Sequence, residues 1–337
     1  MLNVIDCSVF FHYGTKSTFN ATYKGIPTAG IYQLLSLIAD LINTNQDIAL
    51  CFDSRTNRKL LLPDYKSSRV GDPKVSFQAK LTYEYLKDVF PNVYKAENFE
   101  ADDLAYTIVQ NEYRDAPAGI SLITSDYDWC HNIDKYGLVE LLPATENVCL
   151  VNCDNFSDVL STDTVRIPNN AITAYKTIFG DDDLSRNKKF HCNAASPEEL
   201  FNAFKVFVKN KGYNDFDMRR KEVMLEFVTL FSSLFSSEEL ELFNKRIEVF
   251  YPRYCSTLSR VKYNSINKNA LVDLISITGC KSIARKLKVD FVEDMGSEHE
   301  RVKKMYLDEH QTNKVRLTMN KMDVTNTFNR GGFHGIS

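Results

Sequence analysis

The chain has 337 residues, of which 44% are hydrophobic and 25% are charged. This composition excludes a disordered chain and is sufficient for two domains, or for one large domain with an appendage. The net charge of −3 argues against a protein that coats nucleic acid, although a cluster of metal-binding acids would hide a local basic path in the sum.

The eight cysteines indicate reduced thiols, because they form neither a CxxC pair nor a Cys/His cluster with zinc spacing. No apolar run approaches the length of a membrane span, and the N-terminus lacks the layout of a signal peptide. We therefore expect a cytoplasmic protein, in a bacterium or a phage-infected cell, with no membrane partner. A monomer is the default expectation.

In the first half of the chain, predicted strands alternate with predicted helices, which is typical of an α/β sheet with helices on its faces. Short apolar runs predict buried strands in LNVID, DIALCFD, GISLITSD, GLVELLP and NVCLVN. Between them, the apolar spacing predicts helices over TAGIYQLLSLIADLIN and over SFQAKLTYEYLKDVF, the second of which ends before Pro91.

From about residue 195 the strand patterns disappear and the spacing predicts helices. SPEELFNAFKVFVKN opens with a Ser-Pro-Glu-Glu helix start, and KEVMLEFVTLFSSLF and SSEELELFNKRIEVF follow. We expect a core over residues 1–190, a helical domain over 191–325 that binds a duplex, and a flexible tail over 326–337.

Acidic residues follow the predicted strands and open one predicted helix. The carboxyl ends of parallel strands meet at one edge of a sheet, where ligands bind, so these side chains are expected to converge there. The seven residues are Asp6, Asp53, Glu100, Asp102, Asp103, Asp126 and Asp128.

Two interpretations of these acids are open. The EADD stretch on its own is explained by a helix N-terminus, where acids cap free N–H groups, and Asp126 could be the N-cap of a turn. Alternatively, Asp126 and Asp128 point the same way from an extended segment. Because seven converging carboxylates repel one another, we favour a cage for Mg²⁺ or Mn²⁺, which prefer oxygen ligands.

A basic strip, SRTNRKLLLPDYKSSR, follows Asp53 directly. Charge runs are usually solvated loops, but this one lies between two groups of the acids, and a phosphodiester near such acids needs cations to offset its charge. An aromatic ring beside the cations offers a stacking surface for an unpaired base. The residues concerned are Arg55, Arg58, Lys59, Tyr65, Lys66 and Arg69.

The ordered motifs VIDCS, GIPTAGIYQLL, CFDSRTNRKLLLPDYKSSR, FEADDLAYTIV, LITSDYDW and IFGDDD resemble the 5′-nuclease family. That family comprises phage 5′→3′ exonucleases, flap endonucleases and the 5′-nuclease domain of bacterial DNA polymerase I. The resemblance covers about residues 1–185. It implies a PIN-like α/β core with a mostly parallel sheet, a helical arch at about residues 66–95 for a single-stranded 5′ end, and two-metal-ion hydrolysis of phosphodiesters.

The resemblance also implies roles for single residues. The first ion would be held by Asp6, Asp53, Glu100 and either Asp102 or Asp103, and the second by Asp126, Asp128 and Asp181. Lys66 and Arg69 match the basic residues at the base of the arch and would stabilise the scissile phosphate, and Tyr65 matches the stacking residue beside them.

The chain departs from the family pattern in two places. In GDDDLSRN, Leu184 stands where a further acid is usual, which affects the second ion. The glycine hairpin that binds duplex DNA in the family does not follow directly. A similar segment, ITGCKSIARKL, comes later and offers Lys281 and Arg285 to a phosphate; the alternative is an ordinary helix start.

The implied partners are DNA with a 5′ end at a flap or nick, RNA–DNA hybrids, and replication or repair proteins. The main alternative is a catalytically reduced nucleic-acid-binding protein derived from a 5′ nuclease, for which Leu184 is the best support. A toprim domain and a PIN ribonuclease fit less well, because Asp6 stands where toprim needs glutamate and PIN toxins are shorter.

Overall fold

The computed structural model describes most of the chain and divides it into two compact units. The first unit comprises Met1–Val9, Leu41–Arg69 and Pro91–Ile266, and the second comprises Phe10–Asp40, Val70–Phe90 and the chain from Asn267 onward. The described residues are 1–16, 21–67, 69, 71–112, 119–133, 137–141, 149–152, 154–161, 165–168, 170–180, 189–190 and 192–312.

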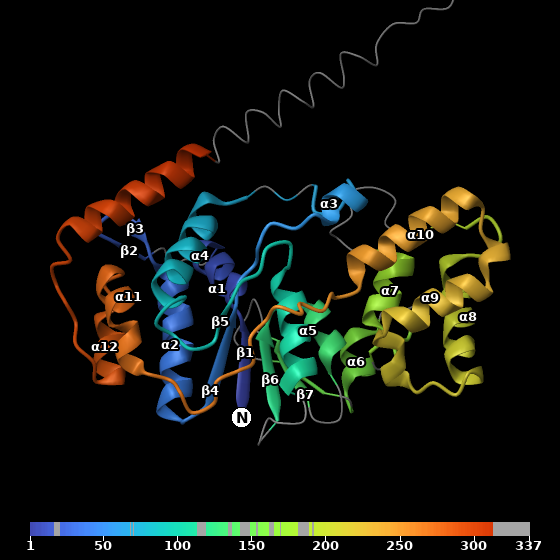
Figure 1. The fold of residues 1–337 in the computed structure, drawn as a ribbon, viewed down its shortest axis with the longest axis horizontal. Coiled ribbons are helices and arrows are strands. Elements are labelled where there is room, and N and C mark those ends of the chain that lie inside the picture. Colours follow the sequence, from blue (N-terminus) through green and yellow to red (C-terminus); the bar gives the residue numbers. More distant parts are fainter. Residues whose placement is uncertain are drawn as a thin grey trace, which may run out of the picture. The chain divides into compact units, whose positions relative to one another are not determined.

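The first unit is built on a six-stranded sheet with the order β5-β4-β1-β6-β7-β8 (Figure 1). All neighbouring strands are parallel except β7 and β8, which are antiparallel. Every residue of β1, β4 and β6 is buried, which explains their continuous apolar runs. The mostly parallel sheet is therefore confirmed. Its strands are β1 (Leu2–Asp6), β4 (Asp47–Cys51), β5 (Val93–Tyr94), β6 (Ile120–Thr124), β7 (Gly137–Leu141) and β8 (Cys149–Val151).

The helices of the first unit follow the predicted pattern in outline. Both α8 and α10 begin with a capping box in which a serine and a glutamate bond each other's backbone N–H groups. The predicted helix from Lys221 ends earlier than expected, at Leu230, where a short 3₁₀ turn follows. The helices are α3 (Arg58–Leu61), α5 (Ala101–Glu112), α6 (Phe156–Leu160), α7 (Ile172–Phe179), α8 (Pro197–Asn210), α9 (Lys221–Leu230) and α10 (Ser237–Phe250), with 3₁₀ helices η1 (Tyr127–Asn132), η2 (Asp215–Arg219) and η3 (Ser232–Leu234).

The predicted domain boundary near residue 190 does not coincide with the division into units. Helices α8 and α10 both pack on α7, through Phe201 against Phe179 and through Arg246, which donates to the Thr177 carbonyl, and the three lie together in Figure 1. After α10, a segment over residues 251–264, which we call the strap, returns along α5. Its Cys255 N–H donates to Thr107 Oγ1 at 2.9 Å and its Val261 N–H donates to Glu112 Oε1 at 3.1 Å. These contacts join the strap to α5.

The second unit contains helices and one two-stranded ribbon. Helix α4 begins at Pro73 after an Asp72 cap and ends at Leu86, slightly before the predicted end at Phe90. Within the described ranges, every helix is too short or too polar to cross a membrane. The elements are α1 (Cys7–Lys16) and α2 (Ala29–Asn43), which both extend into the first unit, β2 (Thr22–Tyr23), β3 (Ile26–Pro27), α4 (Pro73–Leu86), η4 (Lys268–Leu271), α11 (Val272–Ile277), α12 (Lys281–Leu287) and a helix over 297–312.

A tight turn joins α11 to α12, as the ITGCKSIARKL segment suggested. Gly279 at the turn has φ +71°, and a Cβ at this position would overlap the ring of Tyr23, so the turn requires glycine. The side chain of Lys281 pairs with Glu293 at 2.5 Å, and Arg285 is exposed. The hairpin is present, whereas its role in duplex binding stays a prediction. The predicted tail over 326–337 lies outside the described residues.

Candidate functional site

Three carboxylates lie at the carboxyl ends of adjacent strands. Asp6 is the last residue of β1, and Asp53 and Asp126 each follow closely on β4 and β6, the two strands that flank β1. Because the three strands are parallel, their ends meet at one edge of the sheet. The structure therefore brings these residues together, as the order of strands and acids predicted.

Short hydrogen bonds fix the carboxylates of Asp6 and Asp53. Ser8 links the two, because its N–H donates to Asp6 Oδ1 at 3.1 Å and its hydroxyl donates to Asp53 Oδ2 at 2.6 Å. Thr124 donates to Asp6 Oδ2 at 2.9 Å, and the N–H of Ala101 donates to Asp53 Oδ1 at 2.8 Å. Asp53 thus also caps the start of α5.

Within the part of the chain that the structure describes, the acids at this edge form no ion pair with a basic side chain. The pKa of Asp6 is raised to about 8, first by burial and then by the carboxylates of Asp53 and Asp126, although the hydrogen bonds from Thr124 and Ser8 oppose the increase. Within the described ranges, no ion pair involves Asp6, Asp53 or Asp126. An added cation would therefore be favourable here.

The SDYD pair adopts the capped turn rather than the extended alternative. Asp126 is the N-cap of η1 and accepts a hydrogen bond from the Asp128 N–H at 2.9 Å. Although Asp126 as a residue is exposed, the protein around its carboxylate raises its pKa to about 7, together with Asp128 and against Lys176. The extended interpretation of this pair was wrong, because a 3₁₀ turn begins at Tyr127.

The second group of acids, at the start of α5, is held by an arginine. The guanidinium of Arg58 is 2% exposed and bonds to Glu100, to Asp103 Oδ1 at 2.6 Å and to Asp102 Oδ2 at 3.5 Å. We had expected Arg58 on the nucleic-acid-binding strip. The structure instead buries it, because three carboxylates from α5 and the residue before it surround its nitrogens, so it presents no polar atom to a ligand here.

Asp103 is buried completely, and its hydrogen bonds are all to groups of the protein that hold the fold together. Both of its oxygens accept bonds from Arg253, from the backbone N–H at 2.7 Å and from Nη2 at 3.0 Å, and Oδ2 also accepts from the Glu100 N–H at 3.0 Å. Burial raises the pKa of Asp103 to about 6, as does Asp102, while Arg58 and Arg253 hold it down. Of the two acids between which the family motif left a choice, Asp102 faces a pocket and Asp103 does not.

The remaining residues of the basic strip divide into buried and exposed members. Tyr65 is 4% exposed and donates to Glu100 Oε2 at 2.8 Å, so its ring is not available for stacking in this structure, contrary to our expectation. Lys66, in a left-handed conformation, pairs with Glu100 Oε1 at 2.9 Å. Arg55, Lys59 and Arg69 are exposed.

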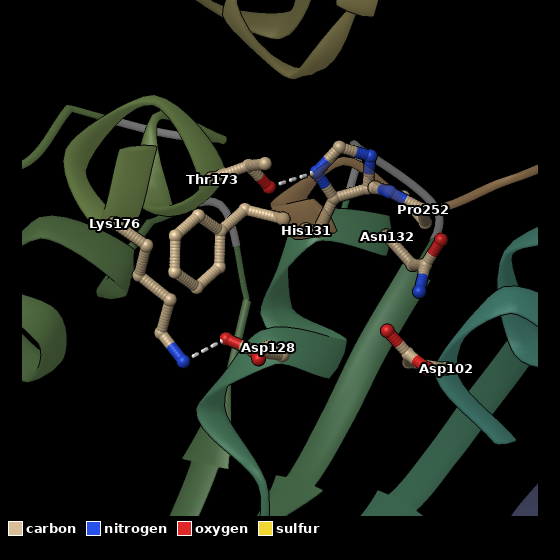
Figure 2. Close-up of a pocket in the computed structure, with 8 residues that line it drawn as sticks. Asp102, Asp128, His131, Asn132, Thr173, Lys176 and Pro252 are labelled. Carbon is tan, nitrogen blue, oxygen red and sulfur yellow. Dashed lines mark hydrogen bonds and ion pairs between the residues drawn. The ribbon is translucent and has the colours of Figure 1, made fainter. Parts of the chain in front are cut away.

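A small pocket lies beside Asp102 and Asp128 (Figure 2), with a cavity of about 10 Å³. Lys176 of α7 forms an ion pair with Asp128 there. His131 shares a hydrogen bond of 2.6 Å with Thr173, and burial lowers its pKa to about 3, so it is neutral. This environment fits the interpretation of His131 as a structural residue.

Sequence reasoning missed Lys176 and Arg253. Arg253 lies 150 residues from its partner Asp103, so no local pattern could have indicated the contact. Lys176 stands two residues before the IFGDDD motif, which was a usable signal. Asp181 and Leu184 lie outside the described residues.

The acids at the sheet edge differ in how well they suit a divalent metal ion. Asp6, Asp53 and Asp126 offer carboxylate oxygens, which suit a hard divalent ion, and among the described residues they form no ion pair. Yet in the part of the chain that the structure describes, no group of three or more His, Cys, Asp or Glu side chains is already arranged to hold an ion. Around Asp128, the charge is already met by Lys176.

A comparison with protein-family models matches residues 2–158 to the 5′-3′ exonuclease N-terminal resolvase-like domain. This region belongs to the 5′-nuclease family. The 5′-nuclease domain thus includes every acid described above, the whole basic strip and the sheet through β8. A sequence comparison with curated proteins gave no match.

Three solved structures align with 85–90% of this chain at low sequence identity. The D15 protein of bacteriophage T5, crystallised with metal ions, is 15% identical, with 90% of this chain and 99% of that chain covered and a TM-score of 0.47. The T5 D15 flap endonuclease in a pseudo-enzyme–product complex with DNA and metal ions is 16% identical, with 90% and 98% covered and a TM-score of 0.48. Human GEN1 bound to Holliday junction DNA is 11% identical, with 85% and 70% covered and a TM-score of 0.50, a likeness of fold alone.

Proposed function

We propose that the chain is a divalent-metal-dependent 5′ nuclease that hydrolyses phosphodiesters near 5′ ends of DNA or RNA–DNA hybrids, at flaps or nicks. One observation carries the proposal: Asp6, Asp53 and Asp126 share the carboxyl edge of the sheet of a 5′-nuclease domain, with no ion pair among the described residues. The solved proteins named above were crystallised with metal ions or DNA, which supports the same chemistry.

The residues at the sheet edge would have two roles, to bind the ion and to orient its ligands. Asp6, Asp53 and Asp126 would hold a divalent ion, which when bound supplies Lewis acidity and a water of lowered pKa. Ser8 and Thr124 orient the carboxylates through the hydrogen bonds described above. All are at the ends of strands or the start of a helix, so their positions are rigid.

The cations of the strip would meet the phosphate. Lys66 lies next to Glu100 and Arg69 is exposed, so both can approach a phosphodiester brought to the sheet edge. Exposed Arg55 and Lys59 would bind neighbouring phosphates. The α11–α12 hairpin, with Lys281 and Arg285, would contact the duplex, and α4 would form part of the arch for the 5′ strand.

A second ion was expected from the resemblance, on Asp126, Asp128 and Asp181. Its support is weaker than that of the first ion, because Lys176 already pairs with Asp128.

The direct test is cleavage of 5′-labelled flap, nicked and RNA–DNA hybrid substrates with Mg²⁺ and with EDTA. We expect short 5′ products in Mg²⁺, and a rate lower by about a thousandfold or more in EDTA or in Asp126→Asn, since ion-assisted steps supply several kcal/mol of the barrier reduction. Equal cleavage with and without the ion would refute metal dependence.

The second candidate, a catalytically reduced nucleic-acid-binding protein, has its own support in the structure. Glu100, Asp102 and Asp103 are bonded to Arg58, and no group in the described ranges is arranged for an ion. Such a protein would bind the flap substrate with salt-sensitive affinity and leave it intact in both Mg²⁺ and Mn²⁺. The same substrates therefore separate the two functions.

A further inference from the structure

The candidate second ion position already contains a positive charge of the protein. Nζ of Lys176, on α7, forms an ion pair with Asp128 Oδ1 on η1, and Figure 2 shows the two side chains reaching toward each other across the pocket. The side chains are 15% and 29% exposed, respectively, so water screens the pair only in part. Helix α7 also packs against η1, and this packing fixes the backbone position of Lys176 relative to Asp128.

The acids fall into two classes by the charge that compensates them. Glu100, Asp102 and Asp103 pair with Arg58, and Asp128 pairs with Lys176. Asp6, Asp53 and Asp126 have no ion pair within the described ranges. Only in the second class is the negative charge left for an added ion to balance.

The cavity beside Asp128 is too small for a hydrated divalent ion while Lys176 stays in place. The cavity lined by Asp102, Asp128 and Lys176 measures about 10 Å³, enough for one water molecule. His131 Nε2 and Asn132 Oδ1 are buried beside it and have no hydrogen-bond partner among the described residues, as expected for atoms that bind such a water. A divalent ion with its remaining waters is larger, so it could reach Asp128 only if the ammonium moved away.

We propose that Lys176 takes the place of a second divalent ion on Asp128 and competes with that ion for it. The inference rests on the proposed function, because it concerns the same sheet edge. It follows that the protein without substrate binds one ion at Asp6, Asp53 and Asp126, and that a second ion binds weakly. Leu184, which replaces a usual acid of the family motif, agrees with a reduced second site.

The test is to count bound Mn²⁺ by electron paramagnetic resonance and to measure each Kd, without substrate. In Lys176→Met, which keeps the apolar stem, we expect the second Mn²⁺ to bind about tenfold tighter, since one partly screened ion pair no longer competes. The first Kd should change much less, because Lys176 acts on Asp126 only through space and forms its ion pair with Asp128. Lys176→Arg, which keeps the charge, should behave as wild type, and so should Lys189→Met, which removes an exposed lysine paired with Glu198.

The outcomes separate this inference from the proposed function. If the first ion binds and is lost in Asp6→Asn, but Lys176→Met leaves the second Kd unchanged, Lys176 does not compete and the inference fails alone. The inference also fails if Lys176→Arg tightens the second ion as much as Lys176→Met does. If wild type and Lys176→Met both bind no Mn²⁺, the inference and the proposed metal-dependent function fail together.

Discussion

Replacing Arg58 with methionine should lower the free energy of unfolding by about 3–5 kcal/mol near pH 8, as expected when one partner of a buried ion pair is removed. Methionine fills most of the same space but leaves Glu100 and Asp103 without their shared cation. Both acids are almost fully buried, at 6% and 0% exposure, so water cannot replace the guanidinium. Urea unfolding monitored by circular dichroism measures the effect.

The pH dependence distinguishes lost charge pairing from lost packing. Burial already raises the pKa of Asp103 to about 6 with Arg58 present, and without Arg58 this pKa rises further. A raised folded-state pKa means that stability is lost as the pH rises, so the deficit of Arg58→Met should shrink at pH 4.5 and grow toward pH 8.

Lys59→Met is the matched control, because Lys59 is the exposed neighbour of Arg58 on the same short helix. It should change the free energy of unfolding by less than about 0.5 kcal/mol. A deficit in Arg58→Met that is equal to the control, or that stays constant between the two pH values, would rule out the role that we assign to Arg58.

Asp6→Asn should make the metal-free protein more stable at alkaline pH while it removes cleavage. The raised pKa of Asp6, about 8, means that the folded protein holds a proton which the unfolded chain releases at a far lower pH. This contribution to stability is complete below the unfolded pKa and is lost as the pH rises through about 8, with a slope of about 1.4 kcal/mol for each pH unit in between. Asparagine does not ionise, so the variant avoids that loss.

The measurement is the free energy of unfolding in EDTA from pH 5 to pH 9, followed by flap cleavage in Mg²⁺. Wild type should lose stability toward pH 9 more steeply than Asp6→Asn, and Mg²⁺ should restore it only in wild type. Asp88→Asn, which changes an exposed aspartate, should follow wild type in both assays. If the free energy of unfolding of wild type and of Asp6→Asn changed with pH in parallel, Asp6 would not be the group whose raised pKa destabilises the protein.

The sheet could be predicted from the sequence because its central strands are buried on both faces. β1, β4 and β6 are short apolar runs for that reason, and each leads into an aspartate. Parallel order then places Asp6, Asp53 and Asp126 at one edge without further information. Exact helix ends were less predictable, as at α4, where the pattern continues to Phe90 but the helix ends at Leu86.

What compensates the acids could not be predicted from local patterns. Arg58 stands in a basic run that reads as a surface strip, and its burial depends on carboxylates more than forty residues later. Arg253 reaches Asp103 through the strap, a contact that only the tertiary fold creates. For Glu100, Asp102 and Asp103 the structure shows compensating charge from Arg58, with Lys66 also paired to Glu100.

We propose that the carboxyl edge of the sheet holds a divalent ion on Asp6, Asp53 and Asp126, which form no ion pair among the described residues. The most direct measurement is an anomalous-difference map from crystals of the full chain soaked in Mn²⁺. We predict a peak within direct ligand distance, about 2.0–2.4 Å, of carboxylate oxygens of Asp6 and at least one of Asp53 and Asp126. If protein from the same crystals cleaves flap DNA when dissolved, but the map has no peak at these residues, the account would be contradicted.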